Sequence, residues 1–247
     1  MNLAIDIGNS FIKIAFFRNN QLVALHEELS EIDAQRILNQ HFVENIIFCT
    51  VRQNAETWKV KLASHACKVF QLTYQTPLPI HNHYQTPHTL GMDRIAALLG
   101  ARYFDKQNAC LVIDSGTCIT YDLLTTENVF SGGAISLGLQ MRFKALAHFT
   151  QKLPLIAWNF SSQNSIDLIG RNTHDAIKSG VVNGYLAEVK GILERYQKEY
   201  GFFSLFLCGG DAPLLMQQLD YQPKYLKKDL LLWGLHAILT YQLSLSQ

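Results

Sequence analysis

The feature that most constrains the fold is a strand–turn–strand pattern that occurs twice in the chain. Residues 3–17, LAIDIGNSFIKIAFF, begin as an apolar strand, break at an Asp-x-Gly-Asn turn and resume as an alternating strand. Residues 109–124, ACLVIDSGTCITYDLL, repeat this pattern with an Asp-x-Gly-Thr turn, so that Asp114 follows Asp6 by 108 residues (114 − 6). Two copies of one unusual hairpin, about half a chain apart, predict a duplicated domain.

Hydrophobic periodicity predicts an α/β protein, with one copy of the domain in residues 1–109 and the other in residues 110–247. The remaining expected elements are helices near 30–40 and 54–66, strands at 44–51 and 68–73, a loop over 76–92, a helix from Asp93, a turn feeding a helix over 129–147, a long helix over 172–200, a strand, glycine turn and helix over 202–215, and a final helix from about Tyr225.

Composition and charge exclude several classes of protein. With 48% hydrophobic and 17% charged residues, the chain is typical of a folded globular protein. Its net charge of +1, without a basic stripe, favours a small-molecule substrate over nucleic acid. We expect no membrane span, because no apolar run is long enough, and a cytoplasmic location, because the five cysteines are scattered and no signal peptide is visible. The phosphate-binding motifs GxxxxGK[ST] and GxGxxG are absent, which argues against P-loop and Rossmann proteins.

The two turns have the composition of a phosphate-binding site. A tight turn that contains glycine exposes backbone N–H groups, which can bind an anion such as phosphate. The side chains that can add donors or positive charge are those of Asn9, Ser10, Lys13 and Thr117. The carboxylates of Asp6 and Asp114 would repel phosphate alone, so we expect a cation between them and the phosphate. For one copy an ordinary Asx turn is an equal alternative, and it is the duplication that favours nucleotide binding.

Six segments resemble the motifs of one known family in order and spacing. They are DIGNSFIK from residue 6, GMDR from 91, DSGTCITYD from 114, GGAISLGL from 132, NTHDAIKSG from 172 and CGGDA from 208. The chain resembles the type III pantothenate kinases, which are members of the actin/hexokinase/Hsp70-like ATPase superfamily, from about residue 6 to residue 216. The resemblance implies two actin-like (ribonuclease H-like) domains, each a mixed sheet flanked by helices, with the active site in the cleft between them.

The same resemblance implies the reaction and its requirements. The expected activity is ATP-dependent phosphorylation of the terminal hydroxyl of (R)-pantothenate to 4'-phosphopantothenate, the first step of coenzyme A biosynthesis. The expected cations are Mg²⁺ and a monovalent cation, K⁺ or NH₄⁺, and the expected assembly is a homodimer with sites near the subunit interface. Kinases of another small alcohol, nucleotide switches of the actin type and a transcription accessory protein remain as alternatives.

The family's functional residues match positions of this chain. Asp93 matches the general base, although an acidic residue in a first helical turn can also simply stabilise its helix. The residues that match substrate contacts are Tyr84, Gly91, Met92, Asp93, Arg94 and Thr173. Those that match the ATP site are Asp6, Ile7, Gly8, Asn9, Ser10, Phe11, Ile12, Lys13 and Thr117. Asp114 matches the monovalent-cation ligand, and Asp6 is expected at the Mg²⁺–phosphate end.

Each assignment has a structural alternative. Arg94 could be a surface arginine, Tyr84 a loop aromatic and Thr173 the N-cap of its helix. Gly132, Gly133, Gly209 and Gly210 are expected to shape the cleft and the nucleoside side. Three residues depart from the family pattern, namely Ser10 for threonine, Cys118 for alanine and Leu137 for proline. Ser10 keeps the hydroxyl, Cys118 is expected to be a small packing residue and not a nucleophile, and the catalytic assignments do not depend on the turn at Leu137.

Overall fold

The computed structural model describes residues 1–9, 11–50, 52, 55–160 and 167–245, and it divides them between two compact units. The first unit comprises residues 1–106, 124–131 and 229–247, and the second comprises 107–123 and 132–228, apart from the positions outside the described ranges. Both units are discontinuous along the chain, so the division of the duplicated domains after residue 109 stays a prediction.

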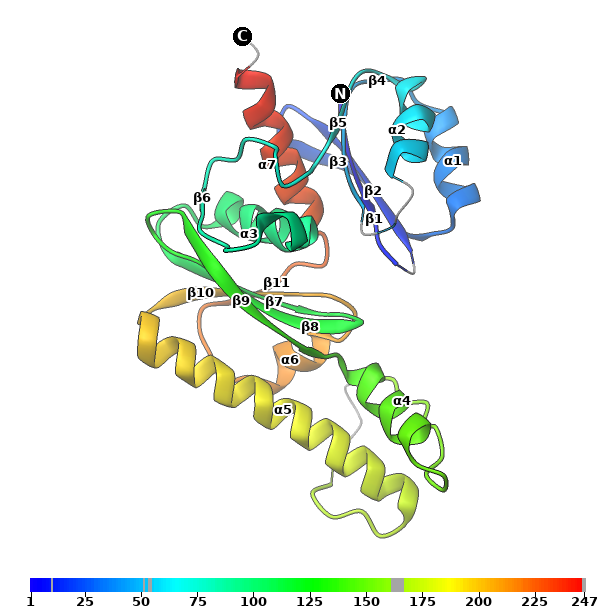
Figure 1. The fold of residues 1–247 in the computed structure, drawn as a ribbon, viewed down its shortest axis with the longest axis vertical. Helices are drawn as coiled ribbons and strands as arrows, with labels where there is room; N and C mark the ends of the chain where they lie inside the picture. The colour runs from blue at the N-terminus through cyan, green and yellow to red at the C-terminus, as the bar shows by residue number, and fades with distance from the viewer. Residues whose placement is uncertain (10, 51, 53–54, 161–166, 246–247) are drawn as a thin grey trace. The chain divides into compact units, whose positions relative to one another are not determined.

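The first unit is built on a five-stranded sheet in the order β3-β2-β1-β4-β5 (Figure 1). Strand β1 pairs antiparallel with β2 and parallel with β4, so the sheet is mixed. Its strands are β1 (Asn2–Ile7), β2 (Ile12–Arg18), β3 (Gln21–Leu29), β4 (Val43–Thr50) and β5 (Ala66–Gln71). The other elements of this unit are α1 (Glu31–Asn39), α2 (Ala55–Ala63), β6 (His81–Asn82), the 3₁₀ turn η1 (Pro87–Thr89), α3 (Met92–Phe104) and α7 (Leu230–Leu245).

The second unit repeats this topology. Its sheet has the order β11-β10-β7-β8-β9, with the short strand β6 paired to the first residues of β9. Strand β7 forms a hairpin with β8 and pairs parallel with β10, as β1 does with β2 and β4. The strands are β7 (Ala109–Ser115), β8 (Cys118–Leu124), β9 (Val129–Leu137), β10 (Phe203–Cys208) and β11 (Lys224–Leu226), and the helices are α4 (Leu139–Phe149), α5 (Thr173–Tyr200) and α6 (Ala212–Gln218).

The order of elements confirms the predicted fold class. Three meandering strands and two parallel strands form each mixed sheet, and a helix follows the last strand of each set, α3 after β5 and α7 after β11. In Figure 1, α1 and α2 lie on one side of the first sheet and α7 on the other. The chain is therefore α/β, with two similar mixed sheets flanked by helices, as the repeated hairpin predicts.

Two helices that are far apart in sequence form the closest helix pair in the first unit. Helices α3 and α7 pack so tightly that the backbone of Gly234 meets the Ala96 carbonyl, and the backbone of Gly100 meets the Leu230 carbonyl. A Cβ atom at either glycine would overlap those oxygen atoms. Because α7 also packs on β1, β4 and β2, it ties α3 to the first sheet.

A local sequence signal accounts for the start of helix α5. Asn172 caps α5, because its side-chain oxygen accepts a 2.9 Å hydrogen bond from the Asp175 N–H. This places Thr173 at the first helical position and not at the cap. The helix continues to Tyr200, as predicted, and ends at Gly201.

Two sequence predictions are wrong, and one strand was missed. Residues 129–137 form strand β9 before helix α4, where we expected only a turn feeding a helix; the glycine-rich sequence conceals a strand whose burial alternates along its length. The final helix begins at Leu230, because residues 224–226 pair with β10 as strand β11. Strand β3 was not anticipated, since its residues are mostly partly exposed at the edge of the sheet.

Among the described residues, no helix has the length and apolar character needed to cross a membrane.

Candidate functional site

The first hairpin presents a tight turn at the end of strand β1. The Gly8 N–H donates to the Phe11 carbonyl over 3.1 Å, which closes the turn. Asp6 lies opposite Lys13 across the two strands, and both side chains are partly exposed. The Lys13 Nζ atom lies 3.6 Å from the Glu27 carboxylate on the neighbouring strand. The hairpin therefore carries a carboxylate and an ammonium side by side next to a tight turn.

Not every residue predicted for the ATP site can present a side chain there. Ile7 and Ile12 are buried in the core of the first sheet, so only their backbone groups are available to a ligand. Asn9 and Phe11 are exposed at the turn. Ser10 lies outside the described residues.

An arginine that sequence reasoning missed holds this turn. The Arg52 Nε–H donates to the Gly8 carbonyl over 2.8 Å, and a second guanidinium nitrogen donates to the Asn9 carbonyl over 3.3 Å. Strands β1 and β4 are parallel, with Ile7 beside Thr50, so residues that follow the two strands meet at one edge of the sheet. Arg52 comes two residues after β4, so the rule that neighbouring parallel strands end at the same edge of a sheet could have pointed to it.

The predicted base lies at the N-terminus of helix α3. Gly91 is the N-cap, Met92 is the first helical residue, and Asp93 follows it with a partly exposed side chain. The Asp93 Oδ1 atom accepts a 2.9 Å hydrogen bond from the Arg94 N–H. This atom lies so close to Gly91 that a Cβ there would collide with it. The glycine thus leaves room for the carboxylate to fold over the helix start.

Arg94 is buried between aromatic rings and is not a surface residue. Its guanidinium carbon lies 5.8 Å from the centre of the Tyr84 ring and 5.9 Å from that of Phe130. The two rings are parallel, with their centres 6.1 Å apart. Such packing restricts the arginine side chain and adds cation–π attraction. Sequence reasoning missed Phe130, because it assigned residue 129 onward to a turn, whereas Phe130 is fully buried in strand β9.

The first hairpin and the start of helix α3 approach one another around a buried thiol. Cys49 lies in strand β4 directly beside Asp6 of strand β1. Burial raises the pKa of the Cys49 thiol, and the nearby carboxylates of Asp6 and Asp93 raise it further. Both carboxylates therefore lie within electrostatic reach of one thiol, and the first unit brings together the predicted phosphate turn and the predicted base.

The second hairpin carries Asp114 and Thr117 against a glycine turn. The Gly116 N–H donates to the Cys118 carbonyl over 3.0 Å, and Thr117 is exposed at the tip. Gly209 has a positive φ of 87°, and a Cβ atom there would lie 2.5 Å from the Asp114 Oδ1 atom. This contact supports the expectation that Gly209 shapes the site.

A second carboxylate that the sequence analysis did not single out lies at this turn. The Asp211 N–H donates to the Ser115 carbonyl over 2.9 Å. Burial raises the pKa of the Asp211 carboxyl from its ordinary 3.8 to about 6. Its position directly after Gly209 and Gly210 was the sequence feature that could have identified it.

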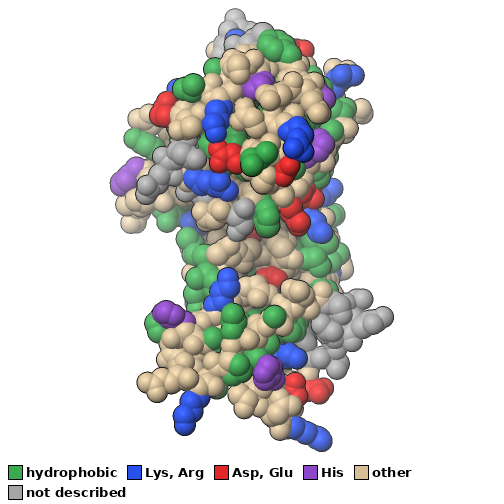
Figure 2. All heavy atoms as spheres, turned by 90° about the vertical axis from the view of Figure 1, so that its right-hand side faces the viewer, with side chains coloured by type: hydrophobic (Ala, Val, Ile, Leu, Met, Phe, Trp, Pro, Cys, Tyr) green, Lys and Arg blue, Asp and Glu red, His purple; other side chains and the backbone are tan. Residues whose placement is uncertain are grey.

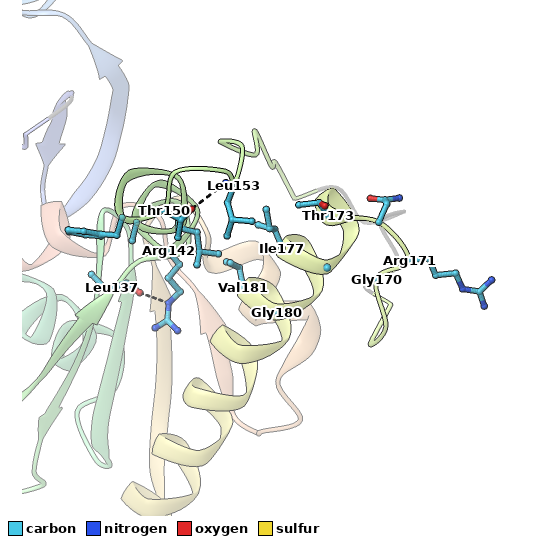
Figure 3. A pocket seen from close by; sticks show the side chains of 15 residues that line it. Leu137, Arg142, Thr150, Leu153, Gly170, Arg171, Thr173, Ile177, Gly180 and Val181 are labelled. Carbon is cyan, nitrogen blue, oxygen red and sulfur yellow. Dashed lines mark hydrogen bonds between the residues drawn. The ribbon is translucent and has the colours of Figure 1, made fainter.

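Thr173 lies away from the second hairpin, at the edge of an apolar groove (Figure 3). The groove has a volume of about 1010 Å³ and lies between helix α4 and the first turns of α5. Apolar side chains of Leu146, Leu153 and Ile177 line it. The structure of the second unit therefore does not bring Thr173 to Asp114.

The residues present are compatible with the two expected cations. Among the described residues no three His, Cys, Asp or Glu side chains cluster as a metal cage. A Mg²⁺ ion carried by nucleotide phosphates needs only one or two protein carboxylates, which Asp6 could supply. A monovalent cation is held by carboxylate and carbonyl oxygens, which Asp114 and its turn could supply.

Charged side chains are mixed on the molecular face drawn in Figure 2. Lys and Arg side chains are interspersed there with Asp, Glu and apolar side chains. The expectation that the protein does not bind nucleic acid stays a prediction.

Comparisons with known proteins agree on the family. The type III pantothenate kinase family profile matches residues 2–195. The type III pantothenate kinase of Cytophaga hutchinsonii is 38% identical over 98% of this chain and 99% of its own length, and that of Phocaeicola vulgatus is 36% identical over 98% of both chains.

Solved structures share the fold. A Campylobacter jejuni protein, described as a conserved candidate transcriptional activator of the Baf family, superimposes with a TM-score of 0.64 at 23% identity, over 98% of this chain and 99% of its own. A Listeria monocytogenes protein, described as a candidate N-acetylmannosamine kinase, superimposes with a TM-score of 0.56 at 13% identity, over 98% and 99% of the two chains. These likenesses concern the fold alone, whereas the family profile and the full-length relatives identify the chain as a member of the type III pantothenate kinase family.

Proposed function

We propose that this protein transfers the γ-phosphoryl group of ATP to the terminal hydroxyl of (R)-pantothenate, the first step of coenzyme A biosynthesis. Family membership supports the reaction. The observation that carries the proposal is the pairing at the start of α3 of a partly exposed carboxylate, Asp93, with an arginine, Arg94, fixed against Tyr84 and Phe130. A general base and a group that binds carboxylate are thereby adjacent in sequence and in space.

In this proposal each acceptor-side residue has one role. The Asp93 carboxylate accepts the proton of the pantothenate hydroxyl, whose oxygen then bonds to the γ-phosphorus of ATP while ADP leaves. Arg94 recognises the carboxylate of pantothenate, for which a guanidinium fork is suited, and Tyr84 helps to fix that fork. Gly91 and Met92 line the same helix start with their backbone groups.

The two hairpins hold the nucleotide in this proposal. Backbone groups from Ile7 to Ile12, with Lys13, bind the phosphates, and Asp6 would hold a Mg²⁺ ion, which would neutralise phosphate charge. Thr117 contacts ATP, and Asp114 holds the monovalent cation, K⁺ or NH₄⁺. Arg52 keeps the first turn in shape through the Gly8 and Asn9 carbonyls.

We also propose that the protein acts as a cytoplasmic homodimer. Tyr185 on α5 reaches the second hairpin through its bond to Ser115, and Thr173 lies twelve residues (185 − 173) earlier on the same helix. This separation corresponds to roughly 18 Å along the helix. Thr173 is thus suited to the site of a neighbouring subunit. Gly180 and Gly184 on the same helix have no described atom within 4 Å of a Cβ position, which leaves room for close contact with a second helix.

The decisive variant is Asp93→Asn, with Asp220→Asn, an exposed aspartate, as the matched control. Loss of the base should lower kcat by about a hundredfold or more while ATP binding is retained. The control should keep wild-type turnover. A kcat for Asp93→Asn close to that of the wild type would exclude Asp93 as the base.

A further inference from the structure

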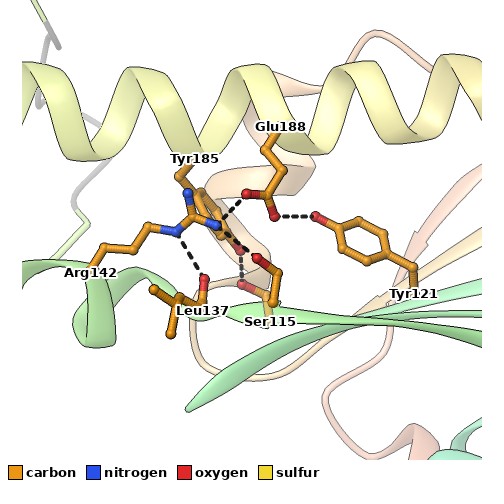
Figure 4. A network of polar contacts seen from close by, with 7 residues as sticks. Ser115, Tyr121, Leu137, Arg142, Tyr185 and Glu188 are labelled. Carbon is orange, nitrogen blue, oxygen red and sulfur yellow. Dashed lines mark hydrogen bonds and ion pairs between the residues drawn. The ribbon is translucent and has the colours of Figure 1, made fainter. Parts of the chain in front are cut away.

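A cluster of polar groups joins helix α5 to the second hairpin (Figure 4). We call it the Tyr185 cluster, and its members are Ser115, Tyr121, Ser136, Leu137, Arg142, Tyr185 and Glu188. All belong to the second unit. Its two tyrosines and its serine at position 115 are fully buried, whereas the Arg142–Glu188 pair is partly exposed.

The innermost contact joins two hydroxyl groups. The Tyr185 hydroxyl and Ser115 Oγ lie 2.5 Å apart and share a hydrogen bond. Ser115 directly follows Asp114 and is the last residue of strand β7, so this bond attaches the start of the turn to α5. A buried hydroxyl without a partner is costly, and the two hydroxyls therefore favour a single arrangement of the turn.

The same residue is fixed through its backbone. The Ser115 carbonyl accepts the hydrogen bond from the Asp211 N–H. Strand β7 also pairs with β10, with Asp114 beside Cys208. Ser115 is thus held by its side chain and its carbonyl at the point where the chain passes from Asp114 into the turn.

Arg142 connects the tyrosine to the other side of the turn. Its guanidinium carbon lies 5.2 Å from the centre of the Tyr185 ring, and its Nε–H donates to the Leu137 carbonyl over 2.9 Å. The next residue, Gly138, packs with its backbone directly against the carbonyls of Gly116 and Thr117. One guanidinium therefore holds both segments that enclose the turn.

Glu188 keeps this guanidinium in place. Its Oε2 atom accepts a 2.6 Å hydrogen bond from Arg142, and its Oε1 atom accepts one from the Tyr121 hydroxyl over 3.4 Å. Burial raises the pKa of the Tyr185 phenol far above its ordinary value, so the hydroxyl stays protonated throughout the working range of an enzyme.

We propose that Tyr185, oriented by Arg142, is a positioning residue that fixes the turn between Asp114 and Thr117 for ATP and its monovalent cation. This inference rests on the proposed function, which assigns those two ligands to the turn. Tyr84, Asp93 and Arg94, the acceptor residues proposed for the same subunit, belong to the other compact unit, and Thr173, proposed for a neighbouring subunit's site, lies twelve residues (185 − 173) before Tyr185 on α5. The effect of Tyr185 should therefore fall on the nucleotide and the cation and spare pantothenate.

The test compares Tyr185→Phe, Ser115→Ala and the double variant with Tyr221→Phe. The control removes another buried phenolic hydroxyl of the second unit, which donates to the Phe203 carbonyl over 2.7 Å away from the turn. Tyr185→Phe should raise the KM for ATP and the half-saturating potassium concentration about fivefold, the equivalent of one buried hydrogen bond. The KM for pantothenate should stay at its wild-type value.

The outcomes separate this inference from the proposed function. If the wild type shows no pantothenate-dependent turnover, the proposed function fails. If the wild type turns over but Tyr185→Phe resembles Tyr221→Phe in all three constants, the positioning role fails. The double variant should have the same constants as each single variant, because each single substitution already removes the one hydrogen bond between Tyr185 and Ser115. If the fold-changes of the two single variants multiply in the double variant, the two residues act independently and the coupling is refuted. Should Tyr185→Phe not fold, Ser115→Ala must show the same pattern alone.

Discussion

Replacing Gly209 with alanine should disturb both the stability of the second unit and its nucleotide site. Gly209 has a φ of 87°, in the left-handed region that L-residues with a Cβ avoid. An added Cβ would lie 2.5 Å from the Asp114 Oδ1 atom and closer still to the Ser115 carbonyl oxygen. Both neighbours belong to the hairpin that we assign to the monovalent cation, so the strain falls on the proposed site itself.

The size of the effect can be worked out from two separate costs. The left-handed backbone costs a residue with a Cβ roughly 1–2 kcal/mol. Forcing a methyl group into packed atoms costs about 1–3 kcal/mol more. Together they amount to about 2–5 kcal/mol, which for a chain of this size corresponds to a Tm lower by on the order of 10 °C.

Alanine variants of two other glycines separate the backbone cost from the cost of overlapping atoms. Gly201 also has a positive φ, of 73°, with a ψ of −139°, and no described atom lies within 4 Å of a Cβ there, so Gly201→Ala should show a backbone cost of roughly 1–3 kcal/mol without any overlap of atoms. Gly210 has open space in the described structure and no positive φ, so Gly210→Ala should unfold at or near the wild-type Tm.

Thermal unfolding and initial-rate kinetics of the three variants test this reasoning. Gly209→Ala should have the lowest Tm, and it should raise the KM for ATP and the half-saturating potassium concentration, which Gly201→Ala at the C-terminal end of α5 should leave unchanged. The reasoning is refuted if Gly209→Ala is as stable and as active as Gly210→Ala.

Two further predictions concern the first unit. Gly234→Ala should unfold at a Tm several degrees lower by thermal scanning, because its Cβ would overlap the Ala96 carbonyl. Gly191→Ala on α5 meets no described atom and should keep its Tm or raise it slightly, because alanine favours a helix more than glycine does; equal Tm values for the two variants would contradict the packing of α3 on α7. Burial lowers the pKa of His236, which is stacked on Phe17, from 6.5 to about 4. As the pH falls, this histidine is therefore protonated in the unfolded state before it is protonated in the folded state. Stability should be full above pH 6.5 and fall by up to about 3 kcal/mol towards pH 4; an equally steep fall in His236→Phe, measured by urea unfolding, would exclude this histidine as the cause.

The elements predicted best from the sequence are those with strong local signals. The repeated turns at Asp6 and Asp114 lie between paired strands in both copies, and the helix of residues 173–200 begins after an asparagine cap. Each signal is read from neighbouring residues, by alternation, glycine or capping. For that reason the duplicated α/β topology could be inferred before any contact was known.

Elements that depend on distant partners were missed. Strand β11 has three residues and exists only because it pairs with β10, so residues 224–226 appeared to belong to the final helix. Strand β9 contains Gly132 and Gly133, which local propensity assigns to a turn. Tertiary pairing overrides local preference at both places.

The same limit applies to the site. Motif matching identified Asp93 and Arg94, but it could not show that Phe130 supports the arginine from another strand or that Arg52 holds the first turn. Tyr185 reaches Ser115 across 70 residues of sequence, which no local pattern indicates. Supporting residues of this kind become visible only when the chain is folded.

The central claim is tested most directly by ADP release from the purified protein with ATP, Mg²⁺ and pantothenate, in potassium and in sodium buffer. We predict turnover that depends on pantothenate and is faster in potassium, which would support the acceptor, the reaction and the cation site together. ADP release that is the same with and without pantothenate would contradict the proposed acceptor and the roles of Tyr84, Asp93 and Arg94.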